Sequence, residues 1–262
     1  MDTRNTALIT GASSGIGYEL AKRFAQDSRN LVLVARSGDK LVQFASELQR
    51  QFGVAAKPIP LDLTAPPAPQ FLFDQMQREG IAVDVLVNNA GYGLFGDFAE
   101  LPLEDSLGQI QLNITALTQL TRLFLSPMLQ RHSGKIMNVA STAGFQPGPR
   151  MAVYYATKAY VISFSEALAN ELAGTGVTVT CLCPGATDTG FQGRAGTENT
   201  VLFKAVRPMD AKIVARDGYR ALMAGKTLAI SGFRNWLLAE SVRFGPRKLV
   251  TAISRKVLDK TG

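Results

Sequence analysis

The sequence is short of the side chains that most often hold metals or cross-link a fold. Among its 262 residues there is a single histidine, His132 in "QRHSG", and there are only two cysteines, Cys181 and Cys183 in "VTVTCLCPG". A lone loop histidine is far more often solvated than bound to a metal, and His132 is no plausible partner for Ser141 in a serine hydrolase. We therefore predict no metal site and interpret the two cysteines as core residues.

Long apolar runs are missing as well. No uninterrupted apolar stretch approaches the length that spans a bilayer, and the opening segment "MDTRNTALIT" combines an acid, Asp2, with a short apolar run. Such a segment is not typical of a signal peptide. We expect a soluble, cytoplasmic protein.

Acidic residues are scarce in the last quarter of the chain. Residues 200–262 carry 13 Lys and Arg against 4 Asp and Glu, whereas residues 1–199 carry 15 against 17. The formal net charge of +7 therefore comes from the C-terminal part, in which residues 231–262 form a basic extension. A charge excess confined to one end does not indicate a nucleic-acid surface, and we expect no nucleic-acid partner.

What the sequence does have is an alternation of short β-branched runs and helical patterns. This alternation is typical of βαβ units, which build a parallel sheet with helices on both faces. The length and the 46% of hydrophobic residues suffice for one large domain with a sizeable core. We predict an α/β fold over residues 1–262, a single-domain Rossmann-type, doubly wound parallel sheet of about seven strands. The expected strands are 7–10, 31–35, 57–62, 83–88, 134–141, 177–183 and 227–231.

A glycine-rich turn follows the first expected strand. The segment "TGASSGIG" (10–17) opens a helical pattern that continues as "YELAKRFAQ". Its glycines allow a tight turn, close approach of the backbone to a pyrophosphate and tight helix packing, and the helix N-terminus adds N–H donors. We predict a nicotinamide dinucleotide site here, which includes Gly11, Ser13, Ser14, Gly15, Ile16 and Gly17.

The end of the second expected strand indicates which dinucleotide is preferred. An acid there would bind the ribose hydroxyls of NAD and repel a phosphate, but the segment reads "VARS", with Ala35 followed by Arg36. The planar guanidinium of arginine suits the 2'-phosphate of NADP, although Ser14 supplies no second cation. The sequence predicts NADP(H) as the preferred cofactor, with NAD(H) as the alternative.

Further short motifs follow the glycine-rich turn in order along the chain. They are "DL" (62–63), "NNAG" (88–91), Asn113, Ser141, Tyr154 with Lys158, and "PGATDT" (184–189). Together with "TGASSGIG", these separate motifs resemble the short-chain dehydrogenase/reductase family in order and spacing, over roughly the first 190 residues. The resemblance implies an oxidoreductase that interconverts a carbonyl and an alcohol.

The resemblance also implies which residues surround the cofactor. Asn113, in the mid-helix segment "LNITAL", would mark a local helix distortion that holds a water for proton relay. The implied cofactor-binding residues are Asp62 and Leu63 beside the adenine, Asn89, Ala90 and Gly91 along the cofactor and the central sheet, and Pro184, Gly185, Thr187 and Thr189 around the nicotinamide and the phosphates.

Tyr154 and Lys158, in "AVYYATKAY", have the spacing of one helix face. Hydride addition to a carbonyl leaves an alkoxide, and a tyrosine hydroxyl is acidic enough to give it a proton. We expect Lys158 to lower the pKa of Tyr154 and to hold the nicotinamide ribose, and Ser141 to donate a hydrogen bond to the carbonyl oxygen. The predicted catalytic residues are Ser141, Tyr154, Lys158 and Asn113, and Tyr154 and Lys158 would also bind the cofactor.

The two neighbouring tyrosines are expected to do other work. Tyr160 continues a stripe through Phe164 and Leu168 on roughly the opposite helix face, so we predict that it packs. Tyr155 has no lysine four residues on. We expect it to face a neighbouring element or subunit and assign it no role.

Loops after the later strands should contact the substrate, because the cofactor occupies the earlier ones. We expect residues 190–208 to form a lid over a mainly apolar pocket, suited to a 3-oxoacyl group, a steroid-like ketone, or an aromatic or aliphatic ketone or aldehyde. The alternative is that many apolar residues of these loops only pack the loops themselves. The residues concerned are Leu94, Phe95, Phe145, Met151, Phe191, Leu202 and Phe203.

The basic extension ends in an expected helix with Leu249, Ile253 and Val257 at spacings of four. Three interpretations remain open: packing against a subunit or the domain, a cover over the substrate pocket, and a basic amphipathic helix on an anionic membrane. An acidic acyl carrier protein would be a further partner for this charge. The other residues concerned are Trp236, Leu237, Leu238 and Phe244, and the basic Lys248, Arg255, Lys256 and Lys260.

Two functions are compatible with these motifs. The first is an NADP(H)-dependent reductase or dehydrogenase, assembled as a homodimer or homotetramer. The second is a catalytically idle NADP(H)-binding sensor or scaffold, which needs the glycine-rich turn but no catalytic residues. The complete set at 113, 141, 154 and 158 favours the enzyme.

Overall fold

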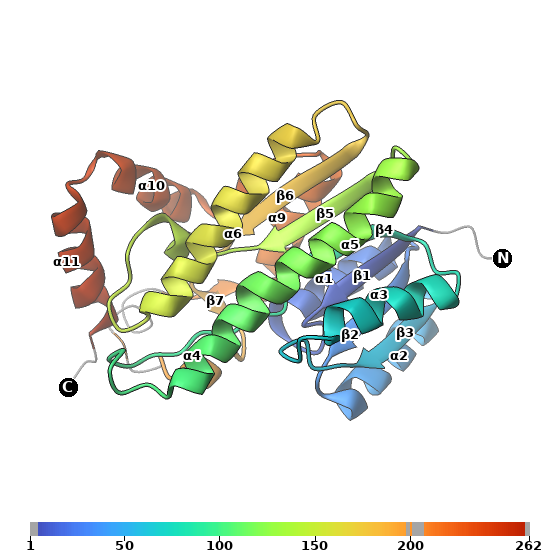
Figure 1. Ribbon diagram of the computed structural model, residues 1–262, viewed down its shortest axis with the longest axis horizontal. Coiled ribbons are helices and arrows are strands. Elements are labelled where there is room, and N and C mark those ends of the chain that lie inside the picture. Colours follow the sequence, from blue (N-terminus) through green and yellow to red (C-terminus); the bar gives the residue numbers. More distant parts are fainter. Residues whose placement is uncertain (1–4, 198–199, 201–206, 260–262) are drawn as a thin grey trace.

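A single parallel sheet of seven strands organises the computed structural model, which describes residues 5–197, 200 and 207–259 (Figure 1). The strand order is β3-β2-β1-β4-β5-β6-β9, so the chain builds outward from β1 to β3 and then crosses back to β4. The predicted α/β fold is confirmed, and each strand lies where the sequence predicts it. The strands are β1 (Thr6–Thr10), β2 (Asn30–Ala35), β3 (Ala56–Pro60), β4 (Val83–Asn88), β5 (Gly134–Val139), β6 (Val177–Cys183) and β9 (Leu228–Ile230).

Helices cover both faces of this sheet, as Figure 1 shows. One face carries α1 (Gly15–Gln26), α2 (Gly38–Phe52) and α9 (Ala211–Met223), and the other carries α3 (Ala68–Arg78), α5 (Leu117–Gln130) and α6 (Ala152–Glu171). The shorter elements are α4 (Leu103–Ile110), the π-helical η1 (Gln111–Ala116), the 3₁₀ helix η2 (Thr142–Phe145), α7 (Phe191–Ala195), α10 (Phe233–Ser241), the 3₁₀ helix η3 (Val242–Phe244), α11 (Arg247–Leu258), and a small parallel pair, β7 (Thr187–Asp188) and β8 (Met209–Asp210).

The core follows from the alternation of side chains along each buried strand. In β1, Ile9 packs with the cluster that includes Leu20 of α1, whereas its neighbour Leu8 packs with the cluster that includes Leu72 of α3 and Phe124 of α5. All five of these side chains are almost completely buried. Two apolar layers therefore hold the sheet rigid, and the carboxyl ends of the strands become a fixed platform.

The helix that covers β4 and β5 is distorted at its centre. It runs without a break through α4, η1 and α5, and the π-helical turn of η1 contains Asn113. Single π-helical turns inside α-helices are frequent at functional sites. The sequence predicted a local helix distortion at Asn113, and the structure has it there.

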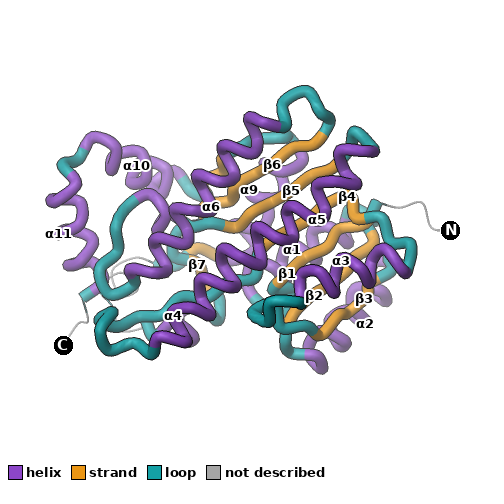
Figure 2. Tube along the Cα trace, in the orientation of Figure 1, coloured by secondary structure: helices purple, strands orange, loops and turns teal. Residues whose placement is uncertain are grey.

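The last part of the described chain forms a separate feature, which we call the C-terminal arm (residues 233–259). It consists of α10, η3 and α11, which extend beyond the carboxyl ends of the strands, at the end of the molecule away from the N-terminus (Figure 2). No helix within the described part of the chain is both long enough and apolar enough to cross a bilayer.

Candidate active site

A cavity of about 690 Å³ lies beyond the carboxyl ends of the strands. This is the place where a doubly wound sheet binds ligands, because the chain reverses its direction of build between β1 and β4 and leaves a crevice there. The cavity extends from Arg36, after β2, to Ile253 on α11. All the predicted catalytic and cofactor-binding residues line it except Gly17 and Asn113.

The glycine-rich turn adopts a backbone that favours glycine. Gly11 and Gly15 have φ angles of +66° and +57°, in the left-handed region that other residues rarely adopt. Gly17 serves a different purpose, because a Cβ atom there would lie 2.4 Å from the carbonyl oxygen of Gly11 and 2.5 Å from Nδ2 of Asn89. Gly17 thus allows α1 to pack tightly against the turn and makes no contact with the cavity.

Side chains from β1 and β4 fix the position of this turn. The Thr10 hydroxyl accepts hydrogen bonds from the backbone N–H groups of Asn89 and Ala90, both at 3.0 Å. The Asn89 amide donates in return to the carbonyl oxygens of Thr10 and Gly11, at 2.9 and 3.2 Å. Asn89 therefore ties two adjacent strand ends together, which agrees with the stabilising part of its predicted role.

The segment after β6 closes over the same turn. A Cβ atom on Gly15 would lie 2.9 Å from the Thr189 methyl group, so the two segments are nearly in contact. The Thr187 hydroxyl donates to the carbonyl of Gly185 at 2.9 Å, which stabilises this second wall. Backbone on two sides and a helix N-terminus together suit the diphosphate of a dinucleotide.

Arg36 and Asp62 stand at the far end of the cavity. Arg36 is more than half exposed, and its Nη1 lies 3.9 Å from a carboxylate oxygen of Asp62. Burial works to raise the pKa of Asp62, but hydrogen bonds from the backbone N–H and hydroxyl of Thr64, together with the Arg36 guanidinium, hold this pKa below its ordinary value. Asp62 is therefore ionised at neutral pH, and Arg36 stands beside it as an exposed cation.

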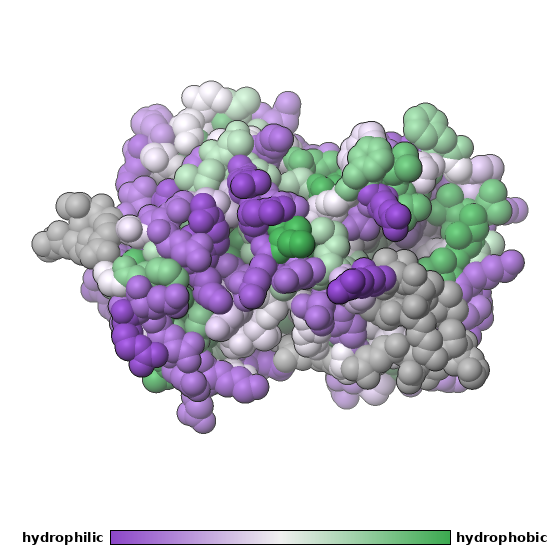
Figure 3. Space-filling view, turned by 180° about the vertical axis from the view of Figure 1, so that it is seen from behind, coloured by the Kyte–Doolittle hydropathy of each residue, from purple (hydrophilic) through white to green (hydrophobic). Residues whose placement is uncertain are grey.

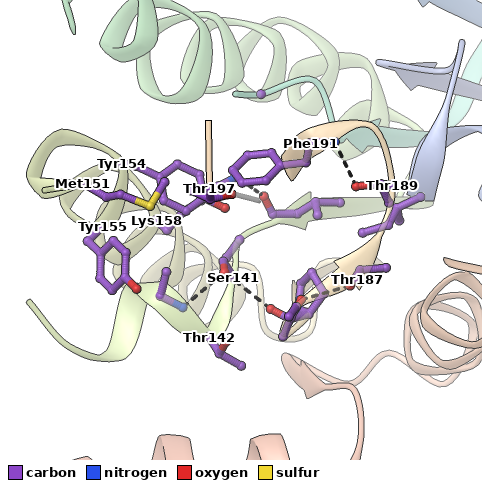
Figure 4. Close-up of a pocket in the computed structure, with 18 of the residues that line it drawn as sticks. Ser141, Thr142, Met151, Tyr154, Tyr155, Lys158, Thr187, Thr189, Phe191 and Thr197 are labelled. Atoms are coloured by element: carbon purple, nitrogen blue, oxygen red, sulfur yellow. Dashed lines mark hydrogen bonds between the residues drawn. The ribbon is translucent and has the colours of Figure 1, made fainter. Parts of the chain in front are cut away.

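Ser141, Tyr154 and Lys158 lie together in the middle of the cavity (Figure 4). Ser141 follows β5 and caps η2, where its Oγ accepts a hydrogen bond from the N–H of Ala143 at 3.1 Å. The Ser141 hydroxyl donates to the carbonyl oxygen of Pro184 at 3.4 Å, a long bond that another acceptor can replace. The same hydroxyl works to lower the pKa of Tyr154.

Tyr154 and Lys158 share one face of α6, as their spacing predicts. The Lys158 Nζ atom lies 5.8 Å from the centre of the Tyr154 ring and donates a hydrogen bond to the carbonyl oxygen of Val139 at 2.8 Å. Burial raises the pKa of Tyr154, and the hydrogen bond with Ser141 opposes that rise only in part. Burial also lowers the pKa of Lys158, to about 8.

The lowering of the Tyr154 pKa that we expected from Lys158 stays a prediction, because burial raises this pKa in the protein alone. The lysine ammonium is directed at the Val139 carbonyl, and the resulting pKa of the tyrosine is set by burial and by Ser141. Lys158 is itself easier to deprotonate than an ordinary lysine, because it is surrounded by protein.

Asn113 lies outside the cavity and acts as a clamp behind it. Its Oδ1 accepts from the N–H of Tyr92 at 3.2 Å, and its Nδ2 donates to the carbonyl of Tyr92 at 2.9 Å and to the Thr157 hydroxyl at 3.1 Å. Asn113 thereby joins the loop after β4 to α6, next to Lys158. The sequence analysis did not identify Thr157 as a residue of the site, although its position next to Lys158 could have indicated it. The relay role of Asn113 stays a prediction.

The other two tyrosines of α6 point to different surroundings. Tyr160 stacks on Phe164, with ring centres 5.7 Å apart, and its hydroxyl lies 2.9 Å from that of Thr118, so it packs as predicted. Tyr155 packs against the C-terminal arm, in a cluster with Leu258. Burial raises the pKa of Tyr155 to about 12, and the hydroxyl of Ser254 on α11 opposes the rise.

Apolar side chains form the wall of the cavity opposite the glycine-rich turn. Two of the predicted loop residues, Met151 and Phe191, belong to it, and the centre of the Phe191 ring lies 5.2 Å from that of Tyr154. Phe95 and Phe145 do not line the cavity: Phe95 packs against the cluster that contains Met151, and Phe145 packs against a separate cluster, as the alternative interpretation of these loops expected. The predicted lid falls partly outside the described residues, as do Leu202, Phe203 and Lys260.

The C-terminal arm completes this apolar wall. The sequence alone had left the role of this segment open. Leu249, Ile253 and Val257, predicted from their spacing of four, all line the cavity, together with Leu238 of α10. Ser254 and Leu258 are buried against the body of the protein. Of the three interpretations of the extension, the structure shows packing against the domain and a cover over the pocket.

Comparisons with known proteins agree with this geometry. The pattern of the family described as short chain dehydrogenase matches residues 5–200. The ketoacyl reductase HetN of Nostoc is 38% identical over 183 residues, which make up 70% of this chain but 63% of that protein, less than two thirds of its length.

Solved structures cover more of the chain. A short-chain dehydrogenase from Sphingobium yanoikuyae in complex with NADPH is 34% identical, with a TM-score of 0.83 over 92% of this chain and 94% of the other. The bulky-bulky ketone specific alcohol dehydrogenase from Comamonas testosteroni is 31% identical, with a TM-score of 0.78 over 92% of each chain. The likeness to these two structures thus reaches beyond the segment that the family pattern matches.

Proposed function

The chain belongs to the short-chain dehydrogenase family, and from this premise we propose that it interconverts a carbonyl and an alcohol on a mainly apolar substrate with NADP(H). One observation carries the proposal. Ser141, Tyr154 and Lys158 converge in a cavity whose other end is a glycine-rich turn built for a diphosphate. The turn and the three side chains share one continuous space, so a dinucleotide and a carbonyl compound fit into it together.

Each catalytic side chain has a definite task in this proposal. Bound in the cavity, NADPH would supply the hydride that adds to the carbonyl carbon. Ser141 exchanges its long hydrogen bond to Pro184 for one to the carbonyl oxygen, and Tyr154 donates the proton that turns the developing alkoxide into an alcohol. Burial of Tyr154 keeps its hydroxyl protonated until the stronger alkoxide base forms beside it.

Lys158 and Asn113 support these groups. Lys158 is fixed by the Val139 carbonyl, and its remaining N–H donors would hold the nicotinamide ribose. Asn113 holds the loop after β4 against α6 and so fixes the depth at which the cofactor and Tyr154 meet. We expect a substitution of Asn113 to change the placement of the cofactor as well as the rate.

NADP(H) is the proposed cofactor because of Arg36. Its guanidinium is exposed at the adenine end of the cavity and is held only loosely by Asp62, at 3.9 Å. A 2'-phosphate bound there would form charge-assisted hydrogen bonds with Arg36, which the hydroxyl of NAD cannot match. The NADPH in the Sphingobium relative is consistent with this preference.

The proposed substrates are apolar carbonyl compounds. Phe191 lies against the ring of Tyr154, and Met151 and Val257 extend the apolar wall away from it. This wall suits a 3-oxoacyl chain, a steroid-like ketone, or an aromatic or aliphatic ketone or aldehyde. Two similar proteins, the ketoacyl reductase of Nostoc and the bulky-bulky ketone specific alcohol dehydrogenase of Comamonas, are named for substrates within this class.

We also infer that the enzyme is a homodimer or homotetramer. Apolar side chains are exposed on and just before α4, and they are Phe98, Leu103, Leu107 and Ile110. Such a patch on a globular protein marks an interface. Light scattering on the purified protein tests this inference, and Leu107→Glu should lower the measured mass to that of a smaller assembly.

The proposed activity is tested by NADPH oxidation in the presence of a panel of carbonyl compounds. The panel contains 3-oxoacyl thioesters, aliphatic aldehydes, steroid ketones and aromatic ketones. We expect turnover with at least one class, and stronger turnover with the larger apolar members than with small polar ones. Absence of oxidation with every class, by protein shown to bind NADPH, would contradict the proposal and favour a binding protein.

A further inference from the structure

The C-terminal arm exposes an unusual amount of apolar surface. Half of the large apolar side chains that are exposed in the described chain belong to this arm, which is about a tenth of the sequence. Phe244, in the turn between α10 and α11, is 88% exposed, and Phe233 is 74% exposed. Figure 3 shows apolar residues gathered on the side of the molecule where α10 and α11 lie.

Two of these side chains form an aromatic pair on α10. The rings of Phe233 and Trp236 stack with their centres 5.7 Å apart, and Leu237 lies on the same helix face. The opposite face of α10 is anchored, because Ala239 is buried. The aromatic pair therefore faces outward from a helix whose inner side is already covered.

Basic residues surround this apolar surface. Arg234, Arg247, Lys248, Arg255 and Lys256 are all exposed on the arm. The two acids of the arm are both engaged, since Glu240 pairs with Arg243 at 3.3 Å and Asp259 pairs with Arg150 of the body at 3.0 Å. The arm therefore presents a surplus of positive charge next to exposed aromatic and aliphatic side chains.

The same pattern holds for α11 by itself. Leu249 and Ile253 are both about half exposed and lie four residues apart on one face, which Lys256 borders. Ser254 and Leu258 on the inner face are buried against the body. α11 is thus an amphipathic helix with one face fixed and an apolar face with a basic border turned outward.

We propose that the C-terminal arm docks on an anionic lipid surface. Aromatic and leucine side chains enter the boundary between headgroups and acyl chains, while lysine and arginine side chains pair with the lipid phosphates. A second copy of the chain fits less well, because the usual symmetric contact would bring the same basic residues face to face. An apolar face suited to self-association exists separately on α4.

The position of the cavity gives this docking a consequence. Leu238, Leu249 and Ile253 are partly exposed and also line the cavity, so one opening of the cavity lies on the docking surface. An apolar carbonyl compound dissolved in the lipid would then reach the active site without crossing water. This consequence rests on the proposed function, whereas the docking itself does not.

The chain contains a built-in reporter for the test. Trp236 is the only tryptophan of the sequence and lies within the exposed apolar surface. On titration of the full-length protein with phosphatidylglycerol vesicles, we expect a blue shift of the tryptophan emission and co-sedimentation of the protein with the vesicles. Phosphatidylcholine vesicles should give a much weaker effect, and salt at about 1 M should reverse binding to the anionic vesicles.

Three variants separate lipid docking from unspecific adsorption. Phe244→Glu, and Lys248→Glu combined with Lys256→Glu, should each weaken vesicle binding by roughly tenfold or more. Phe71→Glu, which changes an equally apolar and half-exposed side chain on α3, should leave it unchanged. All these side chains lie outside the cavity, so the thermal unfolding midpoint and the turnover of a water-soluble ketone serve as controls of folding.

Several outcomes would overturn the proposal. They are the same emission with and without anionic vesicles, equal binding to both lipids, and equal loss of binding in the Phe71→Glu variant. A blue shift that appears on concentration of the protein without lipid would assign the arm to a second copy of the chain. Failure of the activity panel with intact vesicle binding would reject the proposed function and leave the docking in place.

Discussion

Tyr154 and Tyr155 are adjacent on α6, their rings meet edge to face with centres 6.1 Å apart, and the hydroxyl of a different serine works to lower the pKa of each. For Tyr154 this serine is Ser141, at the end of β5, and for Tyr155 it is Ser254, on the C-terminal arm. Burial raises the pKa of both hydroxyls. The two residues therefore share burial and chemistry and differ in what they face, which makes one the natural control for the other.

Cofactor preference should depend on Arg36. Removal of its guanidinium in Arg36→Ala deletes the charge-assisted hydrogen bonds to a 2'-phosphate, which are worth roughly 1.5–3 kcal/mol. We expect the KM for NADPH to rise roughly tenfold or more, with little change in the KM for NADH. Lys40→Ala, which removes an exposed cation outside the cavity, is the matched control. Equal increases in the KM for NADPH and for NADH would show that Arg36 does not select the cofactor.

The packing of the glycine-rich turn should tolerate no side chain at Gly17. In Gly17→Ala the new methyl group would meet the Gly11 carbonyl oxygen at 2.4 Å, and backbone must move to relieve the contact. Overpacking of this kind costs roughly 1–3 kcal/mol of unfolding free energy, and we expect NADPH affinity to fall as well. Gly190→Ala is the control for stability alone, since no other atom lies within 4 Å of the new methyl group and the φ of Gly190 is −69°. A stable Gly17→Ala variant with unchanged NADPH affinity would contradict this account.

Stability should depend on pH through Lys158. Its pKa is about 8 in the folded protein and 10.5 in the ordinary state, so between these values the unfolded chain binds more protons than the folded one. The free energy of unfolding then rises with pH, by roughly 2 kcal/mol between about pH 7.5 and 9.5. Denaturant titrations of the cofactor-free protein should show this rise, and Lys158→Met should abolish it. The same slope in both proteins would mean that Lys158 titrates normally.

Much of the fold could be predicted because its determinants are local. The buried strands can be recognised in the sequence as β-branched runs. Gly11 and Gly15 have positive φ angles, as the glycine-rich turn predicted. The helix distortion at Asn113 was predicted from the resemblance to the family. A single polar residue in the middle of a helix indicates only that its side chain needs a hydrogen-bond partner. Its partners, Tyr92 and Thr157, are supplied by distant segments.

What could not be predicted depends on contacts between distant segments. The spacing of four in α11 shows an amphipathic helix, but only the tertiary structure shows that it covers the cavity and meets Tyr155. The direction of the Lys158 ammonium was also hidden, because the Val139 carbonyl that receives it lies 19 residues earlier. The sequence led us to expect that the charge of Lys158 dominates the pKa of Tyr154. In the structure burial has the largest effect on this pKa.

The most direct measurement of the central claim compares Tyr154→Phe with Tyr155→Phe. Both substitutions remove one buried hydroxyl from neighbouring positions of the same helix, but only the first removes the proposed proton donor. With NADPH and the best ketone of the panel, kcat of Tyr154→Phe should fall by roughly 10² to 10⁴, while Tyr155→Phe stays within a few-fold of the unsubstituted enzyme. Retention of full turnover by Tyr154→Phe, in protein that still binds NADPH, would contradict the assignment of Tyr154 as the acid.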